Sequence, residues 1–478
     1  MSIVHIPPAA KAALSALVLM GLLIAPVGSE QVRVRIDPAR RLQSFEGWGT
    51  SLCWWANAVG GWSDAGKRAE LMDLVFSEEK GLGLNIVRYN IGGGENPAHR
   101  HFLRPGGDVP GFKATPDAPY DWGADANQRW VLLESINRGV TITEAFSNSP
   151  PWWMTVSGSV TGSGPWPAQN SLKDDSYGAF ADYLTEVVRE YRDRYGVIFD
   201  ALSPLNEPDA PWWTFGGSQE GCRFTPDKQQ LILRQVAEQL ARKGLTTRLS
   251  APEENGIDWT IATWKSYDEG TRDLVDQINT HSYHGAKREE LRELARQAGK
   301  RLYMSEYGNG IDGEFGSALE LARVITLDLN ELQPLGWVYW QVVENADTPT
   351  DWGAIHATYS GPGEYAVRKQ YWAYLHFTRH IRPGAVILEV GAPDLVAALN
   401  RGSGDLALVV TNREATERPL SFDLSAFPRL PQKAQGFRTT ETESCAPMAD
   451  IPVSGRALEV CLPPRSISTF VVRTGAPG

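Results

Sequence analysis

The 478-residue sequence predicts an α/β protein, a (β/α)8 TIM barrel with a C-terminal β-sandwich side domain that also takes an N-terminal strand. Two observations support this prediction. From about Phe45 to Thr378, eight short apolar or β-branched runs alternate with loops rich in Gly, Asn or Trp and with helical stretches, as in a closed parallel barrel. From Arg379 onward, helical periodicity disappears and short alternating runs are separated by turn residues, which is typical of an antiparallel sandwich.

The N-terminal 29 residues are predicted to be a signal peptide. Lys11 precedes an apolar run over residues 12–27, and Gly28 and Ser29 follow it. A charged region, an apolar region and small residues at a cleavage site have this order. We expect cleavage after Ser29 and a secreted protein, extracellular or periplasmic. A membrane anchor is the alternative, which the shortness of the apolar run disfavours.

Residues 30–44 contain the alternating stretch QVRVRI, which predicts a strand that precedes the barrel and joins the side domain. Residues 45–378 are predicted to form the catalytic barrel, with helical periodicity in segments such as 176–196 and 227–244. The eight strand runs are SFEGWGTS at Ser44, NIVRYNI at Asn85, VTITEAF at Val140, VIFDALSPLN at Val197, TRLSAPE at Thr247, DQINTHSYH at Asp276, RLYMSE at Arg301 and GWVYWQV at Gly336. An open doubly wound sheet is the alternative, disfavoured because no Gly-rich phosphate turn follows the first strand.

Residues 379–478 are predicted to form the β-sandwich side domain, from runs such as LALVVTNR and SISTFVVR. No linker rich in Pro or Ser separates this region from the barrel, so we expect the two parts to pack rigidly. Cys445 and Cys461 are close in sequence within it, and in an exported chain they predict a disulfide. Cys53 and Cys222 lie in loops, and each could be unpaired.

The composition excludes several classes of protein. Lys and Arg number 46 against 57 Asp and Glu, a formal net charge of −11, so no basic excess favours nucleic acid. Charged residues make up 22% of the chain, which excludes a polytopic membrane protein. No CxxC or His/Cys cluster predicts a metal, and no cofactor is expected.

Seventeen Trp residues indicate sugar binding, because sugar faces stack on flat rings. We expect a monomer.

Two carboxylates close predicted strands of the barrel, where reactive groups of this fold lie. Glu207, in Asn206-Glu207-Pro208, closes the fourth run, and Glu306, in YMSEY, closes the seventh. They are 99 positions apart, which matches three βα units. Strands four and seven lie across the barrel mouth, so the two side chains could form the carboxylate pair that glycoside hydrolysis requires.

Other interpretations of these acidic residues remain open. Either Glu alone could cap a helix or pair with an Arg. Further acids end the third, fifth and eighth runs, and these we interpret as hydrogen-bonding or substrate-contacting groups at best: Glu144, Glu253, Glu254 and Glu344.

The sequence resembles glycoside hydrolase family 30 over nearly the whole mature chain. The resemblance lies in the strand-four NEP and strand-seven SEY, with FEGWGTSLCWW near Phe45, NIVRYNIGGGENP from Asn85, SNSPPWWMTVSG from Ser147 and HSYH at His281. Within the family, GWGTSLCWWAN, IGGGENP and the QEGC at Gln219 are most similar to endo-β-1,6-galactanases. The resemblance implies a polysaccharide substrate, β-1,6-galactan or arabinogalactan. Alternatives are another β-specificity of the family (β-1,6-glucanase, xylanase or glucosylceramidase) and a non-catalytic carbohydrate-binding protein.

The same resemblance implies roles for individual residues. Glu207 matches the acid/base and Glu306 the nucleophile of a retaining mechanism, and Asn206 matches a residue that binds the sugar 2-hydroxyl. Arg88 and Tyr283 are expected to contact the nucleophile. Further substrate-binding residues are expected to be His281, Trp340, Trp153 and Trp55. Adjacent indoles in loops seldom both pack into a core, so each pair offers a candidate sugar platform; the pairs are Trp54 and Trp55, Trp152 and Trp153, and Trp212 and Trp213.

Overall fold

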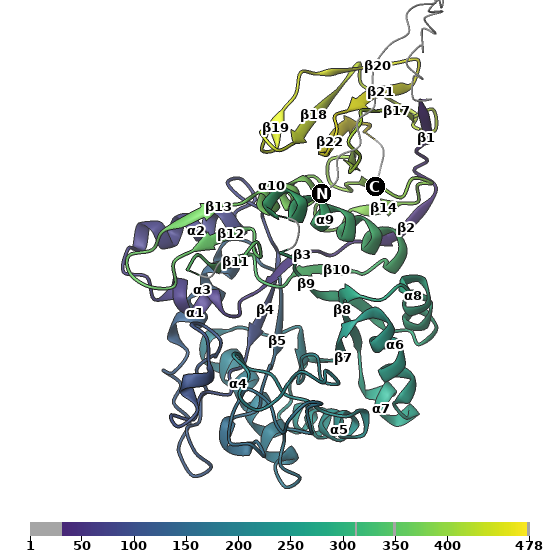
Figure 1. Ribbon diagram of the computed structural model, residues 1–478. Helices are drawn as coiled ribbons and strands as arrows, with labels where there is room; N and C mark the ends of the chain where they lie inside the picture. The colour runs from purple at the N-terminus through teal and green to yellow at the C-terminus, as the bar shows by residue number, and fades with distance from the viewer. Residues whose placement is uncertain (1–30, 311–312, 348–349, 476–478) are drawn as a thin grey trace, which may run out of the picture.

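The structure is a computed structural model that describes residues 31–310, 313–347 and 350–475. A barrel with its helices occupies the lower part of Figure 1, and a β-rich domain lies above it. The predicted signal peptide lies outside the described residues. Within those residues, every helix is too short or too polar to span a bilayer.

The closed barrel confirms the predicted fold class. Eight strands, one from each predicted run, pair in parallel in the order β10-β3-β4-β5-β6-β7-β8-β9. Strands of such a barrel are buried on both faces, which is why they appear in the sequence as nearly continuous apolar runs. Their bounds are β3 Gly47–Ser51, β4 Ile86–Asn90, β5 Ile142–Phe146, β6 Ala201–Ser203, β7 Arg248–Gly256, β8 Gln277–His284, β9 Arg301–Tyr307 and β10 Gly336–Tyr339.

Helices surround the barrel and bury side chains against it. In α4, Gly196 ends the helix at a φ of 70°, a left-handed conformation that favours glycine. In α5, Pro226 occupies the first turn, where its missing N–H is not needed. The helices are α1 Trp55–Gly60, α2 Ala65–Phe76, α3 Ala126–Asn137, α4 Tyr177–Tyr195, α5 Pro226–Arg242, α6 Ile257–Ser266, α7 Glu269–Leu274, α8 Arg288–Gln297, α9 Gly313–Leu327 and α10 Lys369–Thr378, with short turns at Arg100–Phe102, Trp152–Met154 and Asp328–Leu332.

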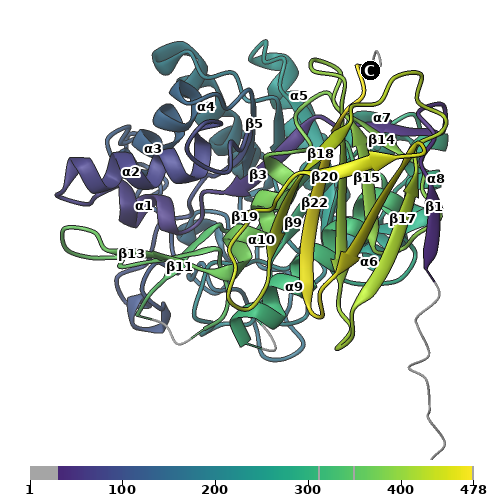
Figure 2. The same cartoon turned by 90° about the horizontal axis from the view of Figure 1, so that it is seen from above.

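The side domain is an 11-stranded sheet that folds over a separate hydrophobic core. Figure 2 shows most of its strands lying side by side. Phe422 and Phe470 come from its two halves and meet with ring centroids 6.0 Å apart. As predicted, the N-terminal strand joins this sheet, because β1 pairs in parallel with β17. The strands are β1 Val32–Arg35, β2 Arg41–Ser44, β14 Val386–Leu388, β15 Leu395–Leu399, β16 Asp405–Asn412, β17 Arg418–Asp423, β18 Lys433–Thr439, β19 Ala446–Pro447, β20 Ile451–Ser454, β21 Ala457–Leu462 and β22 Ser466–Arg473.

Buried contacts join the two parts of the chain. The imidazole of His376, on α10, lies 2.7 Å from the hydroxyl of Thr469 and 2.9 Å from that of Thr439, both on the side sheet. A three-stranded sheet that the sequence did not predict follows the eighth barrel strand; its strands are β11 Val343–Asn345, β12 Ile355–Ala357 and β13 Tyr365–Val367.

The predicted disulfide between Cys445 and Cys461 is wrong, because both cysteines are free. Cys461 is exposed on β21, opposite Pro419 of β17. Cys445 is buried just before β19, which pairs with β18. In the sheet, β20 lies between β18 and β21, so β18 and β21 are not neighbours. Cys53 and Cys222 are also free and buried.

Candidate active site

Two of the predicted residues, Glu207 and Glu306, face each other across the barrel mouth. Glu306 lies on β9, whereas Glu207 follows β6 in a loop with a φ of 47°. Two backbone contacts hold that unusual conformation. The Glu207 N–H donates to the carbonyl of Glu253 (2.9 Å), and the Glu207 carbonyl accepts from the indole N–H of Trp213 (3.0 Å).

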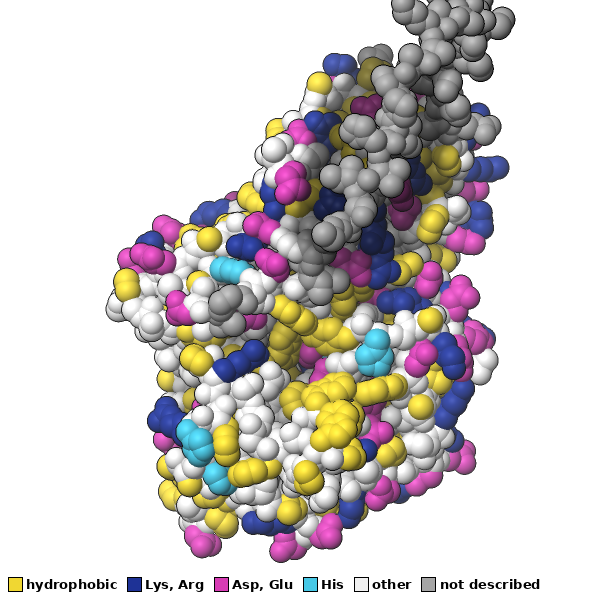
Figure 3. Space-filling view, in the orientation of Figure 1, with side chains coloured by type: hydrophobic (Ala, Val, Ile, Leu, Met, Phe, Trp, Pro, Cys, Tyr) yellow, Lys and Arg dark blue, Asp and Glu magenta, His cyan; other side chains and the backbone are white. Residues whose placement is uncertain are grey.

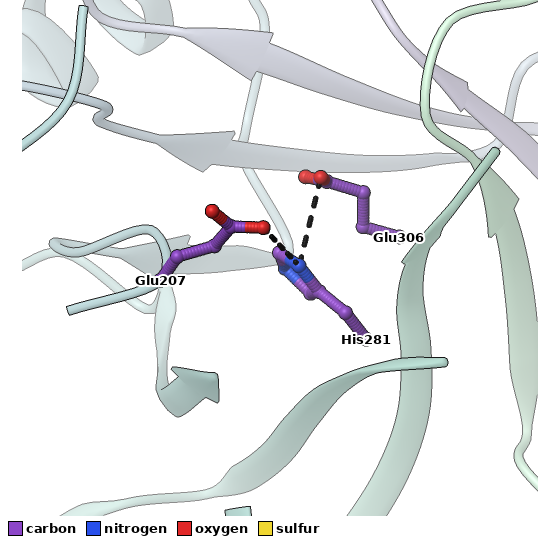
Figure 4. A group of neighbouring side chains, drawn as sticks. All are labelled: Glu207, His281 and Glu306. Atoms are coloured by element: carbon purple, nitrogen blue, oxygen red, sulfur yellow. Dashed lines mark ion pairs between the residues drawn. The ribbon is translucent and has the colours of Figure 1, made fainter. Parts of the chain in front are cut away.

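The two carboxylates are close to each other and to one imidazole. An oxygen of Glu207, an oxygen of Glu306 and a nitrogen of His281 all lie within 4.8 Å of one another. Figure 4 shows both carboxylates directed at that ring. Nδ1 of His281 is 3.3 Å from Glu207 Oε1 and 3.5 Å from Glu306 Oε1.

Both carboxylates open into a cavity of about 700 Å³, although Glu207 and Glu306 are only 6% and 3% exposed. In the space-filling view, hydrophobic side chains surround a hollow in the middle of the barrel face (Figure 3). The cavity is lined by Arg104, Asn206, Glu207, Trp212, Trp213, Gln219, Asn255, Tyr283, Glu306, Trp340, Glu344, Thr350 and Trp352. Its mixture of aromatic rings and polar groups suits a sugar.

Arg88, on β4, is buried and pairs with three carboxylates. Its Nη1 lies 2.9 Å from Glu306, its Nη2 3.0 Å from Glu253 and its Nε 3.2 Å from Glu144. Burial lowers the pKa of Arg88, but these carboxylates more than reverse that effect, so the guanidinium stays charged. Tyr283 adds a neutral donor, its hydroxyl 3.0 Å from Glu306 Oε1. Both residues therefore contact Glu306.

The surroundings of Glu306 shift its pKa in opposite directions. Burial raises the pKa of Glu306, whereas His281 and Arg88 lower it, and the balance is a raised pKa. Burial would lower the pKa of His281, but Glu306, Glu207 and Glu253 raise it to about 10. At neutral pH His281 is therefore an imidazolium, with Nε2 hydrogen-bonded to Glu253 and Nδ1 in ion-pair contact with Glu207 and Glu306. By distance alone these side chains could hold a metal ion.

Glu253 is a residue whose importance the sequence did not reveal. It is buried on β7, where it contacts Arg88 and lies 3.1 Å from Nε2 of His281. The amide of Asn279 donates to it (2.7 Å) and also to Glu144 (3.0 Å). Burial raises the pKa of Glu253, but Arg88 and His281 bring it below its usual value. For Glu144, burial and the charge of Glu253 raise the pKa. Glu253 thus holds Arg88 and His281 beside Glu207 and Glu306.

The remaining acids have other positions. Glu254, next in sequence, accepts instead from Gln229 and Thr263, outside the group around Arg88. Glu344 lines the cavity and accepts from Gln341.

Of the other predicted contacts, Asn206 and Trp340 both line the cavity. The oxygen of the Asn206 amide accepts from Arg88 (3.4 Å). The Trp340 ring meets the edge of Trp54, with centroids 5.2 Å apart. Asn255, which the sequence did not single out, donates from its amide to Glu207.

The prediction that Trp55 binds sugar is wrong. Its side chain is fully buried, because α1 begins at Trp55 and turns the indole inward onto Phe76. Its N–H donates to the carbonyl of Ser51 (2.9 Å). Trp54, its neighbour, lines a second cavity of about 890 Å³ beside the first.

Trp153 does not line either cavity. It packs against the barrel core, and its N–H donates to the carbonyl of Lys113 (2.9 Å). Trp152, the preceding residue, lines the second cavity instead. In the pairs Trp54–Trp55 and Trp152–Trp153, the indole that lines the second cavity is therefore not the one expected to bind substrate.

A (β/α)8 barrel with two opposed carboxylates in an aromatic cavity at the C-terminal ends of its strands defines an O-glycoside hydrolase. The sequence model of a family described as O-glycosyl hydrolase family 30 matches residues 31–288. The chain therefore belongs to glycoside hydrolase family 30, as the motifs indicated.

Known proteins similar to this chain agree with that assignment. An endo-β-1,6-galactanase of Hypocrea rufa is 33% identical over 82% of this chain and 83% of its own length. An exo-β-1,6-galactobiohydrolase of Bifidobacterium longum is 27% identical over 65% of this chain, but the match covers only 28% of that protein. Among solved structures, a conserved exported protein from Bacteroides fragilis superposes with a TM-score of 0.78 at 19% identity, covering 92% of this chain and all of that one. This last likeness shows the fold alone.

Proposed function

We propose that the protein is a secreted, retaining endo-β-1,6-galactanase that cleaves (arabino)galactan side chains by double displacement, with residues 45–378 as its catalytic part. The observation that carries the mechanism is the separation of the two carboxylates, whose nearest oxygens lie within 4.8 Å. Retaining pairs are about 5–5.5 Å apart, whereas inverting pairs need about 6.5–9.5 Å to admit a water molecule.

In the first step, a carboxylate oxygen of Glu306 attacks the anomeric carbon while Glu207 gives its proton to the departing oxygen. The bond from that carbon to the departing oxygen breaks, and an ester to Glu306 forms. Arg88, Tyr283 and His281 support this step because their donors stabilise Glu306 as a charged nucleophile before the attack. We assign the binding of the sugar 2-hydroxyl to Asn206, which lines the cavity.

In the second step, Glu207 takes a proton from water, the water oxygen attacks the anomeric carbon, and the ester to Glu306 breaks. Two inversions give net retention. The ester removes the negative charge of Glu306, so Glu207 no longer faces a second charge and is free to act as base.

The substrate proposal is supported by the similarity to an endo-β-1,6-galactanase over more than four fifths of both chains. Secretion is supported by the predicted signal peptide. The competing specificities are other β-linked glycans, because relatives that match include a glucuronoxylanase and an endo-1,6-β-D-glucanase. A non-catalytic binding protein is set aside, since the chain belongs to a hydrolase family and has both carboxylates.

Product analysis tests the proposal. The purified protein is incubated with β-1,6-galactan freed of arabinose, with β-1,6-glucan and with glucuronoxylan, and the first anomer formed is followed by NMR. We expect a series of oligosaccharides of the β anomer from galactan alone. Products from another polymer would overturn the specificity, and an α anomer would overturn retention. Glu306→Gln should lower kcat by several powers of ten without unfolding the protein.

A further inference from the structure

A group of aromatic side chains lies beside the cavity, on the side of Glu207. We call it the aromatic wall, and it consists of Trp212, Trp213, Trp259 and His284. Trp212 and Trp213 line the cavity itself, and the Trp212 side chain is 37% exposed. What distinguishes Trp212 from a singly exposed indole is that it belongs to a group of aromatic rings beside the cavity.

The wall is held rigidly by its own contacts. Trp212 stacks on Trp259 with ring centroids 5.7 Å apart and an interplanar angle of 28°, and its edge meets Trp213 at 6.2 Å. His284 in turn contacts Trp259 at 4.7 Å. A Cβ on Gly256 would overlap the His284 ring, so this glycine leaves the space that the imidazole occupies.

The wall is also tied to the proposed acid. The indole N–H of Trp213 donates to the backbone carbonyl of Glu207 (3.0 Å), and Trp212 and Trp213 follow Glu207 in the same loop. Because Glu207 must reach the oxygen that departs, the sugar that carries this oxygen has to lie on the side of Glu207. The wall is the aromatic surface on that side, and it is continuous with the cavity.

We propose that the aromatic wall is the binding site for galactose units on the reducing side of the cleaved bond, with Trp212 as the stacking platform. The inference rests on the proposed function and adds the site that holds the leaving sugar. The axial 4-hydroxyl of galactose leaves the C–H groups of C3, C4 and C5 together on one face, and such an apolar face stacks on indole.

The same site receives an acceptor in the second step. When a galactoside rather than water occupies the wall, its hydroxyl oxygen attacks the anomeric carbon, the ester to Glu306 breaks, and the hydroxyl proton passes to Glu207. The protein then transfers galactosyl units as well as hydrolysing them. Because hydrolysis does not need the wall in this step and transfer does, the partition between the two reports on Trp212.

The test compares two substrates in Trp212→Ala. β-1,6-Galactan has leaving sugars that reach the wall, whereas β-1,6-galactobiosyl fluoride has a leaving group of one atom. We expect kcat/KM on galactan to fall about tenfold more than kcat/KM on the fluoride. With the fluoride as donor and galactobiose as added acceptor, the ratio of transfer to hydrolysis should also fall about tenfold. Trp166→Ala is the matched control, because Trp166 is 67% exposed and lines neither cavity.

Equal losses on both substrates, or an unchanged transfer ratio, would overturn the assignment of the wall. Trp212→Phe should restore most of both quantities, which distinguishes stacking from a merely structural role. Trp259→Ala repeats the test should Trp212→Ala fold poorly. If the unaltered protein released the fluoride with inversion, or not at all, the proposed function itself would fail, and the inference with it.

Discussion

Gly221 lies against the ring of Trp213, and one added methyl group there tests how the site is held. The φ of Gly221 is not positive, so the backbone itself accepts alanine. An added Cβ, however, would come closer than 3.0 Å to the Trp213 ring. The ring would have to withdraw by about 1 Å, and its N–H holds the backbone of Glu207.

The size of the effect follows from that displacement. Misplacing a catalytic group by about 1 Å lowers the rate about 100-fold, and overfilling a packed site costs about 1–3 kcal/mol. For Gly221→Ala we therefore expect kcat/KM on β-1,6-galactan to fall about 100-fold while the protein stays folded. Steady-state kinetics and urea unfolding measure the two quantities.

Gly402→Ala is the control, because a Cβ on Gly402 meets nothing within 4 Å. The coupling from Gly221 through Trp213 to Glu207 would be refuted if Gly221→Ala kept kcat/KM within about threefold of the unaltered protein. It would also be refuted if activity fell only in proportion to the fraction unfolded.

Three further predictions concern the carboxylate pair. Glu207→Ala should keep more activity on substrates with good leaving groups than on galactan, and azide should rescue it as a β-glycosyl azide; an α-azide would contradict retention. His281→Gln removes an imidazolium that lowers the pKa of Glu306, so that pKa should rise further. The acidic limb of the plot of kcat/KM against pH should then move to higher pH. An unmoved limb would show that the two groups are not coupled. Arg88→Met leaves buried carboxylates such as Glu253 without their cation and should lower the free energy of unfolding by about 3–5 kcal/mol in urea titrations, whereas a loss under about 1 kcal/mol would contradict that.

The sequence was sufficient for the barrel and for its opposed acids, for a physical reason. Strands buried on both faces need continuous apolar runs, and eight such runs were visible. In this fold the strand ends meet at one mouth, so the positions of Glu207 and Glu306 after the fourth and seventh runs already placed them opposite each other.

What the sequence could not provide were choices between adjacent residues. Glu253 and Glu254 follow each other, and a regular strand would turn one of them inward. The pairing of β7 with β8 shifts register at this point, and Glu253 has a φ of 68°, so alternation does not tell which one faces Arg88. Trp54 and Trp55 posed the same problem, which the start of α1 decides.

The false disulfide has a related cause. Nearness in sequence gives no information about which strands are neighbours in a sheet. Here β20 lies between β21, which carries Cys461, and β18, the strand beside Cys445. The hydrogen-bonding network of Glu253 was also beyond prediction, since it joins β4, β7, β8 and β9 through side chains far apart in the chain.

The pairing of β1 with β17 has a consequence for how the chain reaches its native state. Val32 lies beside Leu420, a partner made about 390 positions later, so at about 5–20 residues per second the first strand waits some 20 to 80 s during translation. Contacts of such high sequence separation are slow to form. The barrel can assemble before the side-domain sheet is complete. The last hairpins synthesised therefore determine when the residues of β1 become protected from proteases.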